Sequence, residues 1–577
     1  MILQALTGYY EDLLQRGEIA APGWSPANIS YALCIDGAGQ PVQVIPTMRE
    51  VTAGKKTVLR PQSMTLPAAV KRTVGAASNF LWDNSSYLLG IDQKGKPERS
   101  RECFAAAKQL HHAVLDGADT PTARAILNFF DNWQPGTAAE HPVLAGQLEE
   151  ITAGGNMTFR VDGCCPQEDE AIREAWRAYR HHGGEDTVEM QCLVTGRQDG
   201  IPAIHPSIKG VRDAQSSGAA LVSFNAPSFC SYGHEQNFNA PVGQYAAFAY
   251  TAALNRLLAD RSNVQLIGDT TVVCWAEGAE PDYQTVAMAA LFGGEEKGFT
   301  DNDLRKMLKR LANGLPCDGL EIDPDRPFYI LGLAPNKSRL SVRLFLRDSF
   351  GRLMRNINDH YERLEIAGAK YQTLPLWSLL QETVNRNTKD KAASPVMAGA
   401  VARAVFSGSP YPASLLEAVM LRIRAERNIT WGRAAILKAY YLKNPHNDCP
   451  KEVLTVSLNE NSTNPAYTLG RLFSVYEAAQ QAANPGINAT IKDKYFNAAA
   501  AMPASIFPVL NNLYQKHQRK LEAGKRIYYD KQVIALKGVL DESYPARLTL
   551  AQQGAFDLGY YHQKQKRYTK KEENENV

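Results

Sequence analysis

The sequence lacks the short motifs that mark most catalytic and metal-binding sites. It contains no H-E-x-x-H, no G-x-S-x-G and no complete phosphate-binding loop. Gly54-Lys55 resembles the end of such a loop, but Lys56 stands where serine or threonine is required. The nine cysteines form no C-x-x-C pair, which indicates neither a zinc ribbon nor a disulfide framework. We therefore expect no catalytic residues, no metal and no cofactor.

Long apolar runs are also missing. No stretch of about 18 apolar residues occurs, so the sequence predicts no membrane span. Residues 1–17 read as an amphipathic helix without the basic and apolar regions of a signal peptide. Scattered cysteines fit a reducing compartment. A chain of 577 residues exceeds what one hydrophobic core usually serves, so we expect two to four domains.

Net positive charge is small overall, but basic residues are concentrated locally. The net charge is only +3, yet three runs each hold six basic residues against a single acidic one. Such patches fit selective contact with a polyanion, although a solvated face remains the ordinary alternative for any one run. The three runs are residues 49–72, 337–355 and 421–443.

Acidic residues offer no obvious metal site. The stretch "EEKGFTDNDL" holds Glu295, Glu296, Asp301 and Asp303. They stand where a helix is expected to begin, and acidic residues are favoured in a first helical turn. We interpret them as helix-start residues.

Residues 334–348, "APNKSRLSVRLFLRD", alternate in character. Successive side chains of a strand point to opposite faces. The pattern therefore predicts one aliphatic face and one face on which Arg339, Arg343 and Arg347 surround Phe345. An exposed, solvated strand is the alternative interpretation.

The expected fold class is α+β, with a large mixed α/β N-terminal region followed by an antiparallel helical bundle. "ISYALCIDGAGQPVQVIP" predicts two strands joined by a turn at Asp36–Gly39. Thr549 and Gln552 have the spacing of a capping box. The predicted segments are 1–150 (an α+β domain), 151–356 (mixed α/β), 357–449 (a helical connector) and 450–577 (the helical bundle).

Many blocks of the sequence, in order along nearly the whole chain, resemble the large subunit of the type I-C CRISPR Cascade surveillance complex. They include "LWDNSSYLLG", "HPSIKGVRDAQSSGAALVSFNAPSFCSYGHEQNFNAPVG", "LGLAPNKSRLSVRLF", "NPAYTLGRLFSVYE" and "LAQQGAFDLGYYHQKQ". The resemblance implies a non-catalytic, cytoplasmic, prokaryotic protein of antiviral defence. Such a subunit recognises the protospacer-adjacent motif (PAM) in duplex DNA, assists unwinding and R-loop formation, holds the displaced strand and provides the platform for a helicase-nuclease.

The resemblance also implies the partners. They are crRNA, target double-stranded DNA, the displaced strand, the Cascade backbone subunits, the subunit at the crRNA 5′ end and the small subunits. The small subunit of this family resembles the C-terminal bundle and is made from an internal start, for which Val453 and Met420 mark candidate regions.

RNA-guided complexes read sequence by base pairing and leave a short duplex motif to the protein. A PAM reader needs basic and amide side chains beside an apolar wedge. The candidates in residues 1–150 are Lys55, Lys56, Arg60, Gln62, Lys71, Arg72, Asn79, Trp82 and Asn84. For Trp82 a plain core role is the alternative, and for the two asparagines it is turn capping.

Two further sets complete the expected interface. The candidates for nucleic-acid or subunit contact are Lys209, Arg212, Gln215, Asn225, Arg339 and Arg343. A single-strand groove combines charge that follows the backbone with stacking rings. Its candidates in the bundle are Arg471, Lys492, Lys494, Lys516, Arg519, Lys520, Lys525 and Arg526, with Tyr495, Tyr528 and Tyr529 nearby.

Two other classes of function stay open on the sequence. One is a nuclease or nucleotide-dependent remodelling enzyme with an unrecognised site. The other is a purely structural scaffold that contacts protein and no DNA.

Overall fold

The computed structural model describes residues 1–53, 56–70, 75–93, 97–182, 188–293, 300–315, 320–385, 387, 392–444, 448–540 and 543–575. By their internal contacts these residues form two units. Unit 1 holds 1–9, 207–221 and 254–577, and unit 2 holds 10–206 and 222–253. Helices α1 (Ile2–Gln15) and α7 (Gln244–Ala259) run through the division. Neither unit coincides with a segment predicted from the sequence, so the four predicted segments stay predictions.

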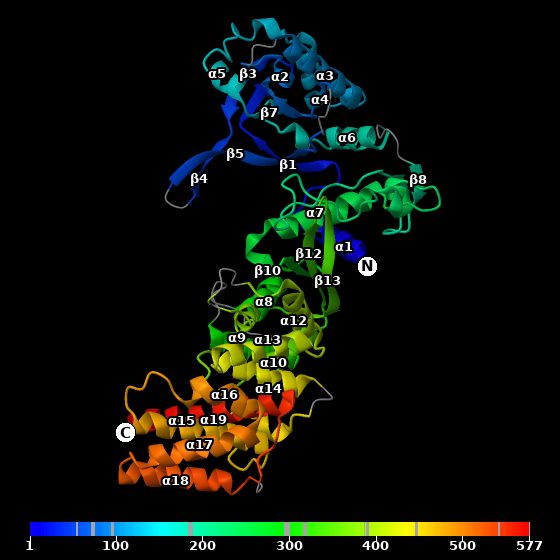
Figure 1. Cartoon of the computed structure of the whole chain (residues 1–577). Coiled ribbons are helices and arrows are strands. Elements are labelled where there is room, and N and C mark those ends of the chain that lie inside the picture. The colour runs from blue at the N-terminus through cyan, green and yellow to red at the C-terminus, as the bar shows by residue number, and fades with distance from the viewer. Residues whose placement is uncertain are drawn as a thin grey trace. The chain divides into compact units, whose positions relative to one another are not determined.

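The described residues of unit 2 form three small sheets, with strand orders β3-β2-β7-β6, β1-β5-β4 and β8-β9. Helix α4 packs on β2 and β7, and a core of aromatic and aliphatic side chains fills the space between. The elements are β1 (Trp24–Ile29), β2 (Tyr31–Ile35), β3 (Pro41–Pro46), β4 (Met48–Ala53), β5 (Lys56–Pro67), β6 (Trp82–Asn84), α2 (Ser85–Leu88), α3 (Pro97–Leu115), α4 (Pro121–Asn132), α5 (Leu148–Ala153), β7 (Asn156–Val161), α6 (Glu170–His182), β8 (Val188–Gln191) and β9 (Gln198–Ile201) (Figure 1).

Unit 1 contains the antiparallel sheet β10-β11-β12-β13, with α8 and α9 inserted between β11 and β12, and after β13 its described elements are helices (Figure 1). Helices α8, α10 and α12 pack against strands of this sheet. The elements are β10 (Gln265–Ile267), β11 (Thr270–Ala276), α8 (Pro281–Phe292), α9 (Asp301–Ala312), β12 (Pro327–Asn336), β13 (Arg339–Ser349), α10 (Phe350–Leu364), α11 (Leu376–Gln381), α12 (Pro395–Ser407), α13 (Ala413–Glu426), α14 (Trp431–Lys443), α15 (Pro465–Ala483), α16 (Ile491–Ala501), α17 (Pro503–Gln518), α18 (Ala523–Lys537) and α19 (Leu550–Glu575).

The α+β fold class and the helical C-terminal region are confirmed. Helix α15 lies at the centre of the bundle, where it contacts α16, α17, α18 and α19. Gly470 and Gly559 allow α15 and α19 to touch. A Cβ at Gly559 would lie 2.1 Å from the carbonyl oxygen of Tyr467, closer than any side chain tolerates.

Local signals in the sequence are confirmed as well. Strands β2 and β3 pair as the predicted hairpin. The backbone N–H of Gln552 donates to Thr549 Oγ1 (3.3 Å), and that of Thr549 donates to Gln552 Oε1 (2.9 Å), which completes the capping box. Helix α9 starts where expected, with Asp303 bonded to the N-cap Thr300.

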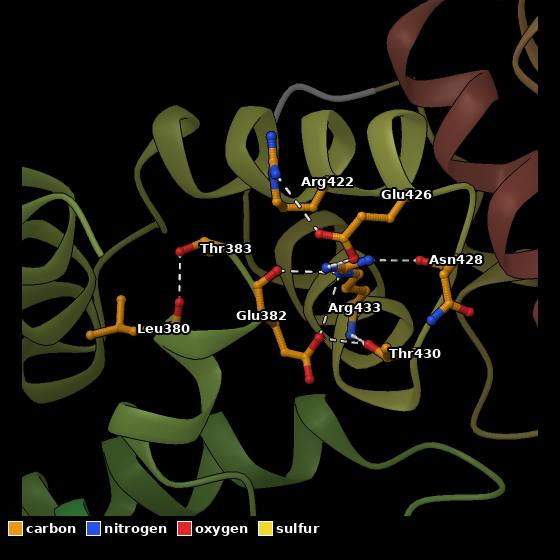
Figure 2. Close-up of polar contacts among 8 residues, drawn as sticks. All are labelled: Leu380, Glu382, Thr383, Arg422, Glu426, Asn428, Thr430 and Arg433. Atoms are coloured by element: carbon orange, nitrogen blue, oxygen red, sulfur yellow. Dashed lines mark hydrogen bonds and ion pairs between the residues drawn. The ribbon is translucent and has the colours of Figure 1, made fainter. Parts of the chain in front are cut away.

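A buried arginine joins three helices of unit 1 (Figure 2). Arg433 in the first turn of α14 is 1% exposed. Its Nη2 lies 2.6 Å from Glu426 Oε2 at the end of α13, and its Nε lies 3.5 Å from Glu382 Oε2 beside the end of α11. Its Nη1 donates to the carbonyl of Asn428 (2.8 Å), and Thr430 donates to Glu382 (2.6 Å). A charge so removed from water is tolerated because both carboxylates face it.

This network corrects one expectation. The basic run at residues 421–443 was predicted to form a positive surface patch, but two of its six members are in the core. Arg433 is paired with carboxylates, and Lys438 is 2% exposed. Burial lowers the pKa of Lys438, because removal from water disfavours its charged form.

A buried carboxyl group lies in the bundle. Asp557 of α19 is 2% exposed, and its Oδ1 has no hydrogen-bond partner within the described part of the chain. Burial raises the pKa of Asp557 to about 8, against a smaller opposing effect of Arg424. The folded bundle therefore binds a proton here that the unfolded chain releases.

Replacing Arg433 by methionine is expected to lower the free energy of unfolding by about 3–5 kcal/mol, because the buried Glu382 loses its cation and the half-buried Glu426 keeps only the longer pair with Arg422 (3.8 Å). Urea unfolding followed by circular dichroism measures the loss. The control is Arg352→Met, which removes an exposed pair with Asp348 and costs less than about 1 kcal/mol. Similar small losses for both variants would contradict the structural role of the buried arginine.

At pH 8, Asp557→Asn is expected to melt at a higher temperature than the unmodified chain. The difference between the two melting temperatures should become smaller toward pH 5. The unfolded carboxyl ionises near pH 4 and the folded one near 8, so the unmodified chain loses stability as pH rises through this window. Thermal melts at several pH values test this. Asp119→Asn is the control variant at an exposed carboxyl. A difference in melting temperature that grows toward acidic pH would contradict the raised pKa of Asp557.

Candidate nucleic-acid interface

A two-stranded ribbon, β4–β5, carries opposed arginines in unit 2 (Figure 1). The antiparallel register pairs Arg49 of β4 with Arg60 of β5, and both residues are exposed. Directly opposed residues place their side chains on the same face of the ladder. Met48 and Leu59, at adjacent positions, are 37% and 58% exposed. The ribbon therefore presents two neighbouring guanidinium groups and apolar surface.

This pairing is unfavourable for the isolated ribbon. Like charges directly opposite one another destabilise a strand pair. Within the described residues neither Arg49 nor Arg60 forms an ion pair. The adjacent acid Glu50 pairs with Leu59, so strand alternation turns it to the other face. An anion lying across the two arginines would remove the repulsion.

The second half of β5 is tied to the body of unit 2. Gln62, half-buried, pairs with the buried Ile29 of β1. Trp82 is 7% exposed, and its Nε1 donates to the carbonyl of Pro67 at the end of β5 (2.8 Å). Trp82 therefore packs in the core and anchors the ribbon, while its contact with DNA stays a prediction.

The two predicted asparagines also serve the local fold. Asn79 is 4% exposed, and its Oδ1 accepts the backbone N–H of Val70 (2.9 Å). Its own N–H donates to Asp83 Oδ2 (2.9 Å). Asn84 is the N-cap of α2, with its Oδ1 accepting from the N–H of Ser86 (3.0 Å). Their roles as readers of base edges stay predictions.

Three of the predicted PAM-reading residues, Lys55, Lys71 and Arg72, lie outside the described residues. Lys56 is described by its backbone, which pairs with Ala53 at the end of the ribbon. Arg49 was in the predicted basic run but not among the candidate site residues. Arg49 becomes a candidate because β4 pairs with β5 in the register that places it opposite Arg60. The sequence does not reveal that register.

The segment 207–221 of unit 1 is irregular. The backbone N–H of Lys209 donates to Asn255 Oδ1 (2.8 Å), and that of Arg212 donates to Thr271 Oγ1 (3.1 Å). Both side chains are exposed. Arg212 and Arg261 line a pocket of about 370 Å³. The backbone is thus fixed, and the cations face outward.

Gln215 and Asn225 belong to different units. Gln215 is exposed in unit 1, where its carbonyl accepts from the N–H of Gly218 (2.9 Å). Asn225 is exposed in unit 2. A joint role for the two in nucleic-acid or subunit contact stays a prediction.

Strand β13 does not present three arginines in a row. Leu333 pairs with Val342 and Gly332 pairs with Leu344, which leaves Arg343 unpaired in a β-bulge. A bulge interrupts the alternation of side chains along a strand. Val342 is accordingly 43% exposed, although the pattern assigned it to the aliphatic face.

Each arginine of β13 has its own surroundings. Arg343 forms an ion pair with Asp269 (3.5 Å). The guanidinium of Arg347 lies 5.8 Å from the ring centroid of Tyr329 on the neighbouring strand. Arg339 is half-buried at an isolated bridge with Ala220. The predicted single arginine face is therefore wrong, and a contact of Arg339 or Arg343 with nucleic acid or a subunit stays a prediction.

Two basic residues of the bundle are held by the fold. Arg471 is 8% exposed, its Nε donates to Gln563 Oε1 (3.1 Å), and its Nη1 reaches carbonyls at 459–460. Burial lowers the pKa of Arg471. Lys492 is half-buried, and burial together with the charge of Lys564 lowers its pKa. These surroundings make both residues weak candidates for an exposed strand.

The other basic candidates of the bundle are exposed. Lys494 lies with its Nζ 5.1 Å from the ring centroid of Tyr495. Five more flank the turn between α17 and α18, which we name the α17–α18 corner, and Tyr528 beside it is 50% exposed. The corner consists of Lys516, Arg519, Lys520, Lys525 and Arg526.

The described ranges hold neither a metal-binding cluster nor a membrane-spanning helix. No group of three or more His, Cys, Asp or Glu residues there could hold a metal ion. None of the helices in these ranges is both long and apolar enough to cross a membrane.

Comparison with known proteins adds one match. A family model described as CRISPR-associated protein (Cas_Csd1) matches residues 6–568. No curated protein matches the chain. The matched stretch contains the ribbon, the segment 207–221, β13 and the bundle.

Proposed function

Because the chain belongs to the Cas_Csd1 family of CRISPR-associated proteins, as a Csd-type large subunit of type I-C Cascade, we propose that it reads the PAM in duplex DNA. As a non-catalytic subunit it then assists unwinding and R-loop formation, holds the displaced strand and supports the helicase-nuclease in antiviral defence. The partners required are crRNA, the backbone subunits, the crRNA-5′-end subunit and the small subunits. The prokaryotic cytoplasm, where these nucleic acids are found, is the compartment that this role requires.

The observation that carries the proposal is the pair Arg49–Arg60 on the exposed β4–β5 ribbon. The major groove of DNA admits a two-stranded β-ribbon, and arginine is the residue most often used to read guanine there. Phosphates beside the groove supply the negative charge that two opposed guanidinium groups need. An RNA-guided complex requires this kind of local duplex reader.

The parts of the ribbon divide the task. Arg49, Arg60 and Gln62 contact base edges or adjacent phosphates. Lys55 and Lys56, which follow Ala53 in the sequence, contact the DNA backbone, as do Lys71 and Arg72 farther along the sequence. Trp82 holds β5 in place through Pro67, so that the ribbon approaches the duplex as a fixed element.

The displaced strand binds the α17–α18 corner. A single strand is held by cations that follow its phosphates and by rings on which its bases stack. The corner offers five exposed cations beside the exposed ring of Tyr528. The segment 207–221 and β13 contact crRNA-bound neighbours through Lys209, Arg212, Arg339 and Arg343.

Arg49→Glu with Arg60→Glu is expected to weaken binding of the assembled complex to PAM-containing duplexes by tenfold or more, and Lys55→Glu with Lys56→Glu to weaken it further. The physical reason is the loss of base-edge and phosphate contacts, worth about 1–3 kcal/mol for a good bidentate pair. Mobility shifts at several salt concentrations, with a library of duplexes randomised beside the target, give both affinity and motif preference.

The control variant is Lys108→Glu with Arg124→Glu, which reverses two exposed charges of α3 and α4. Its binding should stay within about threefold of the unmodified complex. Unchanged motif preference in the ribbon variant would remove the ribbon from the PAM site. Binding that ignores the motif altogether would favour the scaffold alternative, and Mg²⁺-dependent cleavage abolished by an acidic-residue substitution would favour a nuclease.

A further inference from the structure

Unit 1 contains a pocket of about 500 Å³ that none of the sequence-predicted site residues lines. Its walls come from α9, from the segment 364–374 between α10 and α11, and from Trp431 at the start of α14. Helices α9 and α10 pack against each other within this unit. The charged lining is one-sided, with four cations against one carboxylate: Arg305, Lys306, Lys309 and Lys370 against Glu365.

The walls of the pocket are fixed to one another. Asp301 in the first turn of α9 accepts the backbone N–H groups of Gln372 (2.6 Å) and Thr373 (3.1 Å), and the hydroxyl of Thr373. These bonds attach the segment that carries Lys370 and Tyr371 to the helix that carries the other three cations. The cations therefore converge on one space without a rearrangement of the chain.

Arg305 supplies an unused donor at this pocket. The residue is 6% exposed, its Nη2 lies 2.5 Å from Glu365 Oε1, and its guanidinium lies 5.9 Å from the ring centroid of Tyr361. Its Nη1 is buried and has no hydrogen-bond partner within the described residues. A buried donor without a partner costs free energy, which an anionic acceptor in the pocket would recover.

Aromatic rings accompany the cations. Tyr371 is 55% exposed, and Lys370 Nζ lies 5.2 Å from its ring centroid. Trp431 is half-buried and lines the same pocket. Rings give a flat base a stacking surface, and lysine and arginine give a phosphate its donors.

We propose that this pocket binds a nucleoside phosphate, with the phosphate toward Arg305, Lys306 and Lys309 and the base against Tyr371 or Trp431. The ligand is either a free mononucleotide or one nucleotide of a single strand, since both present the same chemistry. The volume of about 500 Å³ suits one such unit. A free mononucleotide goes beyond the proposed function, whereas a strand rests on its displaced-strand role. Neither ligand uses a residue of the ribbon or of the α17–α18 corner.

Calorimetric titration of the purified full chain at low salt tests the pocket. The probes are adenosine monophosphate, adenosine, inorganic phosphate, a deoxyadenosine octanucleotide and a glutamate octapeptide. Saturable binding of adenosine monophosphate is expected. Lys306→Gln with Lys309→Gln should weaken it by tenfold or more, because two charge-assisted contacts are lost. Tyr371→Ala should weaken it by fivefold or more, because a stacking ring is lost.

The control is Lys108→Gln with Arg124→Gln, which removes two exposed charges of unit 2 and should leave binding of the mononucleotide unchanged. Equal affinities for mononucleotide and octanucleotide identify a free nucleotide as the ligand. An octanucleotide affinity higher by 100-fold, and lost in the pocket variants, identifies a strand.

Three results overturn the proposal. They are the absence of saturable binding, phosphate binding that equals adenosine monophosphate binding and ignores Tyr371→Ala, and displacement of the mononucleotide by the acidic peptide. Tyr371 is exposed, so its variant tests the pocket even where the lysine double variant fails to fold. The outcome is independent of the ribbon, and failure of one proposal leaves the other standing.

Discussion

The guanidinium of Arg433 is the buried charge on which the helical part of unit 1 depends. Moving this guanidinium group away from its carboxylates would leave a buried ion without a partner, which costs free energy. The two ion pairs therefore hold α14 in one position relative to Glu382 and Glu426 (Figure 2). The backbone is shaped to allow this. A Cβ at Gly432 would lie 2.8 Å from Glu382 Cγ, and Arg427, with φ of 50°, ends α13 in the left-handed region.

This constraint reaches both the pocket and the bundle. Trp431, two residues before the arginine, lines the basic pocket, so the ring is positioned by the same first turn that the ion pairs hold. Farther along, α14 packs on α10 and on α19, and α19 in turn packs on α15 across Gly470 and Gly559. Protein interiors contain few voids, so closely packed helices cannot shift independently. The orientation of α14 therefore fixes that of α19, and through α19 that of α15.

The sequence allowed prediction where the signal is local. The hairpin at Asp36–Gly39, the capping box of Thr549 and Gln552 and the helical C-terminal region depend on neighbouring residues, and they are confirmed. The prediction failed where the outcome depends on how separate elements meet. The bulge at Arg343 arises from how β13 meets β12, and the burial of Arg433 and Lys438 arises from helix packing. The opposition of Arg49 and Arg60 and the pocket of α9 likewise depend on how separate elements meet.

The environment of each arginine distinguishes the two uses of positive charge in this chain. Arg433 has carboxylates 2.6 Å and 3.5 Å away, and Arg471 donates to an amide and to carbonyls. The guanidinium groups of both residues therefore have their partners within the fold. Arg49 and Arg60 are exposed, face each other and form no ion pair among the described residues. Buried arginines such as Arg433 support the fold only as long as their partners remain. The exposed pair Arg49 and Arg60 destabilises the ribbon until an anion binds to it. The position of uncompensated charges, and not the net charge, decides where an anionic partner binds. A nearly neutral protein can therefore hold a strongly anionic partner at specific sites.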